Sequence, residues 1–324
     1  MRAVRVDGFD GPAGVVCAEV AAPEAGADEV LIEVRAAGVA YPDVLHTRGA
    51  YQERHDPPFV LGGECAGVVL AAPASSSHRP GDRVAAVLPI GAFAEVVAAP
   101  EHLVLPLPDS LSFDEGACLP INYLTVHFAL GERGGLRPGE TVLVQGAAGG
   151  IGTATIQLAA ALGARVLAVT STPEKAAFAR KAGAHEVVDA AAFRAEVAEL
   201  TGGRGVDVVV DPVGGDRFTD SLRCLRSRGG RLLVVGFTAG AIPTVTVNRL
   251  LLSNTDVRGV GWGMPAFAEP GFVAAQWREL TPHLRAGALS PPVSAVYPFA
   301  RAADALAAVD GRRVLGKVVL HPGS

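Results

Sequence analysis

The sequence predicts an α/β protein in which a doubly wound parallel sheet accompanies a second, β-rich domain. Residues 1 to about 120 carry short β-type runs separated by Gly, Pro and Asp, which is typical of a compact β domain. From Thr141 onward, strand and helix patterns alternate. After about residue 262 the alternation stops, and this tail is expected to return to the first domain. We therefore divide the 324 residues into 1–121, 122–260 and 261–324.

Individual elements follow from the local patterns. Strands of the first region are expected at Val30–Val34, Ala66–Leu70, Arg83–Val87, Phe93–Ala98 and Leu103–Leu105. In the second region the strands become continuous apolar runs, as expected where both faces of a parallel sheet are covered. They include Val206–Val210 and Leu232–Val235, with helices at Pro173–Ala182 and Gly214–Leu225. The tail predicts helices at Phe272–Arg285 and Arg301–Val309 and strands at Ala295–Tyr297 and Lys317–Leu320.

A glycine-rich turn predicts a dinucleotide site. The buried-type run Val142–Val144 leads into Gln145-Gly146-Ala147-Ala148-Gly149-Gly150-Ile151-Gly152, and the helical stretch Thr153–Leu162 follows. A second strand pattern, Arg165–Val169, arrives after one helix length, as a βαβ unit requires. Glycines let the backbone approach a pyrophosphate closely, and the helix N-terminus directs N–H groups at it. The alternative is a turn of this kind that binds nothing.

The end of the second strand of this unit favours NADPH. Proteins that prefer NAD usually carry Asp or Glu about 20 residues past the glycines. Here Thr170-Ser171-Thr172 stands in that place, and Lys175 follows at the start of the next helix, where its ammonium can neutralise a ribose phosphate. The alternative is that Ser171 and Thr172 only cap the helix.

Composition limits the partners. The net charge is −5 and no basic run occurs, so nucleic acid is not expected as a partner. No apolar segment approaches the roughly 20 residues that cross a membrane, and a cytoplasmic location is expected. The four cysteines, Cys17, Cys65, Cys118 and Cys224, lie far apart in apolar stretches, which favours reduced buried thiols. His46 and His55 lack any metal-ligand spacing and are expected on the surface or in loops.

Several segments together resemble the medium-chain dehydrogenase/reductase superfamily, and specifically its zinc-free quinone oxidoreductase branch. The resemblance spans nearly the whole chain. Its carrying segments are Gly38–Val44, Leu61–Val69, Pro80–Val84, Gly91–Glu95, Ala147–Gly152 and Gly316–Leu320. The resemblance implies a GroES-like β-rich catalytic domain made from both chain ends, a Rossmann domain between them, and an active site in the cleft. It also implies a homodimer formed through the Rossmann domains.

The resemblance also implies that no metal is bound. Zinc-dependent members carry Cys and His in the segment after the glycine-valine pair, followed later by Gly-His-Glu. Ala40, Tyr41 and Gly63 stand in the metal-ligand places here, and Glu64 alone is kept. No Cys-x-x-Cys or comparable His pair supplies another tetrahedral set.

Without a Lewis acid, the acceptors expected are quinones and α,β-unsaturated carbonyl compounds, whose conjugation spreads the negative charge created by hydride addition. Tyr51 matches a tyrosine that related reductases present to the substrate, where a phenol can donate a hydrogen bond or proton. The alternative is a pocket-shaping tyrosine with water as the donor. Tyr41 is expected to border the same pocket, and Thr125 to face the nicotinamide unless it caps a helix.

The coenzyme site collects residues from four places in the chain. Gly236 and Phe237 follow a buried strand, at the sheet edge where dinucleotides bind. Lys317, in the terminal Gly-Lys segment, is expected either to reach the coenzyme or to form a surface ion pair. The predicted coenzyme residues are Ala147, Gly149, Gly150, Ile151, Gly152, Thr170, Ser171, Lys175, Gly236, Phe237 and Lys317.

Two other functions fit the same pattern. One is reduction of enoyl thioesters, which uses the same hydride geometry on a larger substrate. The other is a regulatory protein that binds NADPH without turnover, because a glycine turn shows capacity for binding and not for catalysis.

Overall fold

The structure, a computed structural model, describes residues 1–323. The chain forms two compact units. Unit 1 comprises Met1–Asn122 and Pro265–Ser324, so both ends of the sequence contribute to it, and unit 2 comprises Tyr123–Met264. Within residues 1–323, no helix combines the length and the apolar character needed to cross a bilayer.

Unit 1 is built on two β-sheets. The smaller has the order β2-β1-β4, and the larger β15-β16-β3-β5-β6-β8, with β7 also paired to β3. The strands are β1 (Arg2–Val6), β2 (Val15–Glu19), β3 (Glu29–Val39), β4 (Phe59–Val60), β5 (Glu64–Ala71), β6 (Arg83–Val87), β7 (Val96–Pro100), β8 (Val104–Pro106), β15 (Val293–Pro298) and β16 (Lys317–His321). The helices are α1 (Tyr41–His46), α2 (Phe113–Gly116), α9 (Gly263–Ala268), α10 (Phe272–Arg285) and α11 (Ala302–Asp310).

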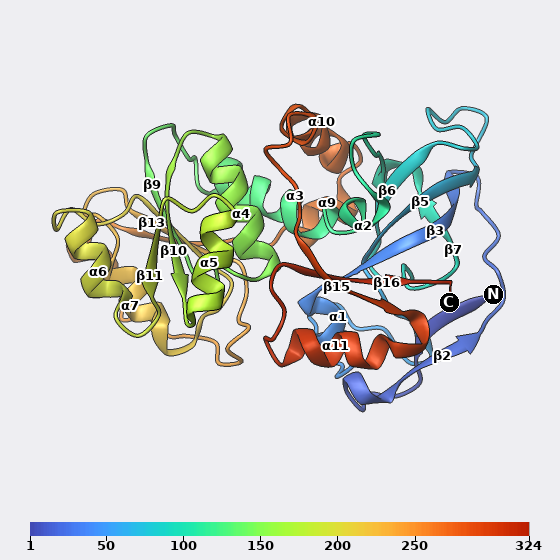
Figure 1. The fold of residues 1–324 in the computed structure, drawn as a ribbon, viewed down its shortest axis with the longest axis horizontal. Helices are drawn as coiled ribbons and strands as arrows, with labels where there is room; N and C mark the ends of the chain where they lie inside the picture. Colours follow the sequence, from blue (N-terminus) through green and yellow to red (C-terminus); the bar gives the residue numbers. More distant parts are fainter. Residues whose placement is uncertain (324) are drawn as a thin grey trace. The chain divides into compact units, whose positions relative to one another are not determined.

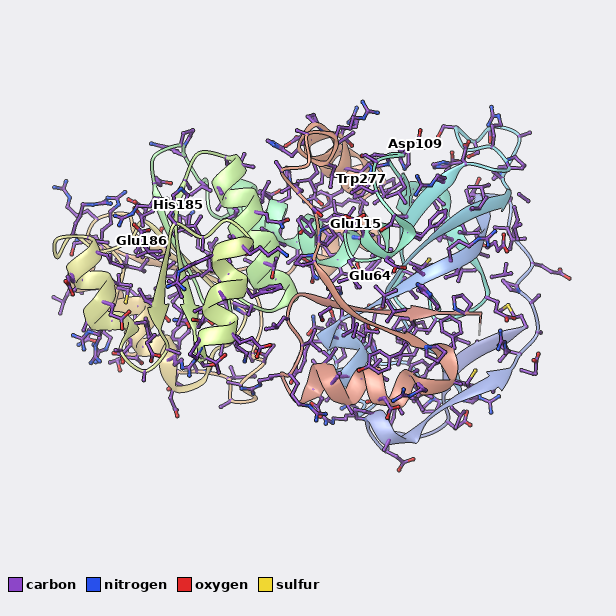
Figure 2. The ribbon with its side chains drawn as sticks, viewed as in Figure 1. Glu64, Asp109, Glu115, His185, Glu186 and Trp277 are labelled. Atoms are coloured by element: carbon purple, nitrogen blue, oxygen red, sulfur yellow. The ribbon has the colours of Figure 1, made fainter. Side chains whose placement is uncertain are left out.

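The C-terminal strand joins the N-terminal part of unit 1 directly. β16 pairs antiparallel with β3, where Val318 lies opposite Val39, and parallel with β15 on its other side (Figure 1). A single apolar core therefore contains side chains from both ends of the sequence, among them Val39, Val318 and Leu320. α10 is attached by Trp277, whose indole N–H donates to the carbonyl of Pro106 at 3.0 Å (Figure 2).

Unit 2 is a doubly wound parallel sheet with the order β11-β10-β9-β12-β13-β14. α4 and α5 lie on one side of it, and α6 and α7 on the other (Figure 1). The central strands β9 and β12 are buried along their whole lengths, which accounts for their apolar, β-branched composition. The elements are α3 (Pro120–Phe128, whose first three residues belong to unit 1), β9 (Thr141–Val144), α4 (Gly150–Ala161), β10 (Arg165–Thr170), α5 (Pro173–Lys181), β11 (Glu186–Asp189), α6 (Phe193–Leu200), β12 (Val208–Asp211), α7 (Phe218–Arg223), β13 (Arg231–Val234), α8 (Asn248–Ser253) and β14 (Asp256–Gly259).

Three local expectations were wrong. The helix predicted at Gly214–Leu225 is interrupted, because Gly214 and Gly215 both have positive φ, and only Phe218–Arg223 is α-helical. The strand predicted from Phe93 begins at Val96, since the carbonyl of Phe93 accepts instead from Val4 of β1. Cys17 is exposed because β2 is an edge strand, whereas the other three cysteines are buried; all four are free thiols.

The short helix α1 is held at its start by a buried carboxylate. Asp43 reaches back from the first turn, and its Oδ2 accepts from the Ala40 N–H at 2.7 Å. Burial raises the pKa of Asp43 to about 7, although the Ala40 hydrogen bond and the positive charge of Lys317 oppose the change. Asp43 therefore takes up a proton near neutral pH in the folded protein.

This shift predicts a pH dependence of stability. The usual pKa of 3.8 applies to unfolded Asp43, so between pH 3.8 and about 7 the folded state binds the extra proton. The stabilisation that this proton provides is complete below pH 3.8 and is lost as the pH rises through about 7. Asp43→Asn should remove this contribution and so flatten the fall of the unfolding free energy, measured by urea denaturation at several pH values. Parallel curves for the variant and the wild type would contradict the assignment.

Candidate functional site

The glycine turn connects β9 to α4 in a conformation that side chains would obstruct. Gly146 has φ of +59°. A Cβ added to Gly152 would lie 2.3 Å from the carbonyl oxygen of Gly146 and 2.6 Å from the Cα of Ala147. Gly149 is the N-cap residue of α4, and no side chain caps the helix. The turn thus presents backbone N–H groups at the positive end of a twelve-residue helix, an arrangement suited to a phosphate group.

Loops that follow neighbouring strands meet this turn at the carboxyl edge of the sheet. A Cβ on Gly146 would be 3.0 Å from the side chain of Val213, in the loop after β12. That loop is joined in turn to the loop after β13, because the Thr238 N–H donates to the Pro212 carbonyl at 3.1 Å. A Cβ on Gly214 would lie 3.0 Å from the ring of Phe237. The glycine turn and the Gly236-Phe237 segment are therefore brought to one edge, flanking the point where the strand order reverses between β9 and β12.

Asp211 shapes the loop after β12. Its buried Oδ1 accepts from the Val213 N–H at 2.8 Å and from the Gly214 N–H at 2.9 Å, forming a turn of the Asx type. Burial raises the pKa of Asp211, while these two hydrogen bonds oppose the change. The carboxyl group of Asp211 thus fixes the main-chain conformation of the loop next to the glycine turn.

The segment after β10 contains both the hydroxyl groups and the helix start that the sequence suggested. Thr170 is buried at the end of the strand, and Ser171 is exposed. Thr172 caps α5, because its Oγ1 accepts from the Lys175 main-chain N–H at 3.2 Å. Capping explains the role of the Thr172 hydroxyl. The donor in this cap is the main-chain N–H of Lys175 and not its ammonium group. The capping alternative therefore leaves a role for the Lys175 side chain open.

In unit 1, the two predicted substrate-side tyrosines lie on α1 and in the segment that follows it. Tyr41 is the first residue of α1. Tyr51 follows the helix and packs against His46, with ring centroids 4.6 Å apart and ring planes tilted by 50°. Burial raises the pKa of the Tyr51 phenol, and the negative charges of Asp43 and Glu53 add to this effect. Tyr51 therefore remains a protonated donor at neutral pH.

His46 was expected in a loop or on the surface, and this was wrong. It is the last residue of α1 and is 5 % exposed, because α1 packs against α11. Burial lowers its pKa to about 4, and the charge of His55 contributes in the same direction. The imidazole that supports Tyr51 is therefore neutral at physiological pH.

Thr125 lies within α3, whose first residue is Pro120, and its side chain is buried. A helix cap precedes the first helical residue, so the capping alternative for Thr125 is wrong. Its expected position facing the nicotinamide remains a prediction.

A buried ion pair occupies the region of Ala40 and Gly63. Lys317 Nζ lies 2.7 Å from Glu64 Oε1, and the two side chains are 4 % and 0 % exposed. The same ammonium donates to the Val39 carbonyl at 2.9 Å, and Glu64 Oε2 accepts from the Ile121 N–H at 2.8 Å. Burial acts to lower the pKa of Lys317, but the charges of Glu64, Cys118 and Asp43 and the hydrogen bond to Glu64 together outweigh it, and the pKa is raised. The lysine is thus held as a cation.

The surface ion pair considered for Lys317 is therefore wrong, because β16 lies between β15 and β3 and directs this side chain inward. Its pairing with Glu64 was missed, since 253 residues separate the two in sequence. One signal was available: a lysine that begins the apolar run Val318-Val319-Leu320 needs a buried counter-charge. The contact between His46 and Tyr51 was missed as well.

Among residues 1–323, no three His, Cys, Asp or Glu side chains are grouped so that they can hold a metal ion.

Comparisons with known proteins cover both units. Residues 26–109 match the alcohol dehydrogenase GroES-like domain, and residues 150–281 match the family described as zinc-binding dehydrogenase. Quinone oxidoreductase-like protein 2 of Bos taurus is 36% identical over 302 residues, which is 90% of this chain and 84% of that protein.

Two solved structures match along nearly the whole chain. A probable oxidoreductase from Mycobacterium abscessus has a TM-score of 0.91 and 44% identity, covering 99% of both chains. The quinone oxidoreductase of Thermus thermophilus, solved also in its complex with NADPH, has a TM-score of 0.85 and 38% identity, covering 99% of this chain and 100% of that one. The chain therefore belongs to the medium-chain dehydrogenase/reductase superfamily of oxidoreductases, in its zinc-free quinone oxidoreductase branch.

Proposed function

We propose that this protein transfers a hydride from NADPH to quinones or α,β-unsaturated carbonyl compounds without zinc. The observation that carries the proposal is the uncapped glycine turn at the start of α4, followed at the end of β10 by Thr170-Ser171-Thr172 where NAD enzymes usually have an acid. Relatives described as quinone oxidoreductases, including one solved with NADPH, support the choice of chemistry.

The residues present fit a dinucleotide. The close packing of Gly152 against the Gly146 carbonyl oxygen keeps the turn compact, and the uncapped amides of α4 suit a diphosphate, which the main chain of Ala147 and of Gly149 to Gly152 would hold. Thr170, Ser171 and Lys175 would surround the ribose phosphate, and the main chain of Gly236 and Phe237 would hold the carboxamide. When bound, NADPH supplies the hydride. The chain's own groups orient the nicotinamide and exclude water.

The substrate side lacks the ligands of a zinc enzyme. Ala40 and Gly63 offer no side-chain ligand atom in the places where zinc-dependent members carry them. An acceptor that is already conjugated needs less electrophilic assistance, because its negative charge spreads over an enolate or a hydroquinone anion. Tyr51, protonated and supported by neutral His46, is assigned as the donor to that oxygen, with Tyr41 beside the same substrate.

We also propose a homodimer formed through unit 2. β14 is the last strand of its sheet, and its outer edge has no neighbouring strand among the described residues. Leu251 and Leu252 of α8, which precedes it, are 75% and 78% exposed. An open strand edge beside exposed leucines is suited to a second copy of the same surface. The free cysteines fit a reducing compartment, and we infer a cytoplasmic location.

A panel of acceptors tests the proposed function against its two rivals. We expect NADPH absorbance to fall with a benzoquinone, an ortho-quinone or a simple enone. Oxidation only with a crotonyl thioester would favour the enoyl-thioester reductase. Tight NADPH binding without oxidation by any acceptor would favour the regulatory binding protein and contradict the proposal.

Lys175→Ala should weaken NADPH binding by roughly ten- to a hundredfold, because charge-assisted hydrogen bonds to the ribose phosphate are lost. NADH, which lacks that phosphate, should bind nearly as before. Fluorescence titration with each coenzyme measures both effects. Lys181→Ala, at the other end of α5, is the matched control. Equal losses for both coenzymes would refute the assignment of Lys175.

Tyr51→Phe should reduce turnover by at least about tenfold and leave the NADPH dissociation constant unchanged, because only the donor to the product oxygen is removed. Steady-state kinetics with the best acceptor of the panel and a separate NADPH titration provide the measurement. Tyr297→Phe in β15 controls for the loss of a phenol elsewhere in unit 1. If turnover is unchanged, Tyr51 shapes the pocket and water supplies the proton.

A further inference from the structure

One peptide group in unit 1 is held at both of its polar ends by buried ionisable side chains. The carbonyl of Val39 accepts from Lys317 Nζ at 2.9 Å, and the N–H of Ala40, in the same peptide group, donates to Asp43 Oδ2 at 2.7 Å. This peptide joins Val39, the last residue of β3, to Ala40, the N-cap residue of α1. The direction in which α1 leaves β3 is therefore fixed by a hydrogen bond from the Lys317 ammonium, which is stronger than one between neutral groups, and by a second hydrogen bond to the Asp43 carboxyl group.

Glu64 fixes the ammonium group in turn. Its Oε1 lies 2.7 Å from Lys317 Nζ, and its Oε2 accepts from the Ile121 N–H in the first turn of α3. Gly38 makes room for this arrangement, because a Cβ there would lie 2.8 Å from Glu64 Oε1 and 2.1 Å from the Ala117 carbonyl oxygen. One carboxylate thus connects β16, through Lys317, to the start of α3.

Stability alone is a poor explanation for such a pair. Taking two charges out of water costs several kcal/mol per ion, and replacing a buried pair by neutral side chains of similar volume is often neutral or stabilising. Neutral side chains, however, could not provide the charge-assisted hydrogen bond that Lys317 donates to the Val39 carbonyl. The distinctive effect of the pair is thus the geometry that it imposes on α1.

The far end of α1 leads to the predicted proton donor. His46 is its last residue, and the ring of Tyr51 rests against the ring of His46 at 4.6 Å. α1 has only six residues, so few residues separate the held peptide from His46 and can absorb a shift at the start of the helix. The position of Tyr51 therefore depends on the peptide that Lys317 and Asp43 hold.

We propose that Lys317 and Glu64 are positioning residues for the reaction, which set the place of α1 and, through His46, of Tyr51. This inference rests on the proposed function for its catalytic consequence. Lys317 acts through the Val39 carbonyl and not on the substrate. This role is distinct from the coenzyme contact that the sequence suggested for Lys317, and the two predict different measurements.

The test removes both charges together, so that neither is left unpaired. In Glu64→Gln/Lys317→Met the amide oxygen of the glutamine can still accept from Ile121, but the cation at Val39 is gone. We expect hydrogen–deuterium exchange, read by mass spectrometry, to become faster over residues 40–51, and kcat to fall about ten- to a hundredfold. The NADPH dissociation constant should stay within about twofold, since the phosphate-binding turn lies in unit 2.

A second buried pair supplies the control. Arg231 and Glu140 in unit 2 form a bidentate ion pair, with distances of 2.9 and 2.6 Å, at the amino ends of the strands. Glu140→Gln/Arg231→Met should change the melting temperature and leave kcat and exchange over residues 40–51 as in the wild type. If the double variant of Glu64 and Lys317 does not fold, Glu64→Gln alone is judged by the same two measurements.

Each outcome decides one question. Faster exchange over residues 40–51 together with lower kcat and unchanged NADPH affinity supports the proposal. Unchanged exchange overturns it, as does faster exchange with unchanged kcat. Loss of NADPH affinity would overturn it in favour of direct coenzyme contact by Lys317. A wild-type protein that reduces no acceptor would contradict the proposed function, whereas the exchange result would still show whether the ion pair holds α1.

Discussion

The buried ion pair between Lys317 and Glu64 is the interaction on which the organisation of unit 1 depends. It joins the last strand of the chain to β5, and the same two side chains hold main-chain groups at Val39 and Ile121. A lysine at this depth is tolerated only because a carboxylate and a carbonyl both face it. Every element that meets there is constrained in direction, since charge-assisted hydrogen bonds lose strength quickly as their geometry is distorted.

Unit 2, by contrast, presents main-chain N–H groups as hydrogen-bond donors in place of charged side chains. Its glycine turn leaves the first amides of α4 without a side-chain cap, and the loops after β12 and β13 are fixed by main-chain hydrogen bonds and by Asp211. Main-chain donors are rigid and lose little conformational entropy when a ligand binds. In the proposed function, selectivity between coenzymes comes from a few side chains after β10, where hydroxyl groups and Lys175 stand in place of an acid.

Much of this architecture could be predicted from sequence. The fold class was confirmed, because apolar runs such as Val208–Val210 and the glycine turn are local patterns. The family assignment was confirmed as well, because its motifs are contiguous segments. What sequence did not reveal depends on pairing between distant segments. Lys317 meets Glu64 only because β16 lies beside β3, and Cys17 is exposed only because β2 is an edge strand.

For the same reason, the candidate substrate side was harder to predict from the sequence than the coenzyme side. A phosphate-binding turn is encoded by adjacent glycines, whereas the environment of Tyr51 is created by His46 and by the burial of α1 against α11. In zinc enzymes a metal and its ligands fix this region. Here the small Ala40 stands in a ligand place, and the ammonium of Lys317 binds the carbonyl of the preceding Val39. The cation is turned toward a carbonyl of the protein, so it stabilises the shape of the region rather than a negative charge on the substrate. In the proposed reaction, such a region suits an acceptor that stabilises its own charge, with the Tyr51 phenol as the proposed donor to its oxygen.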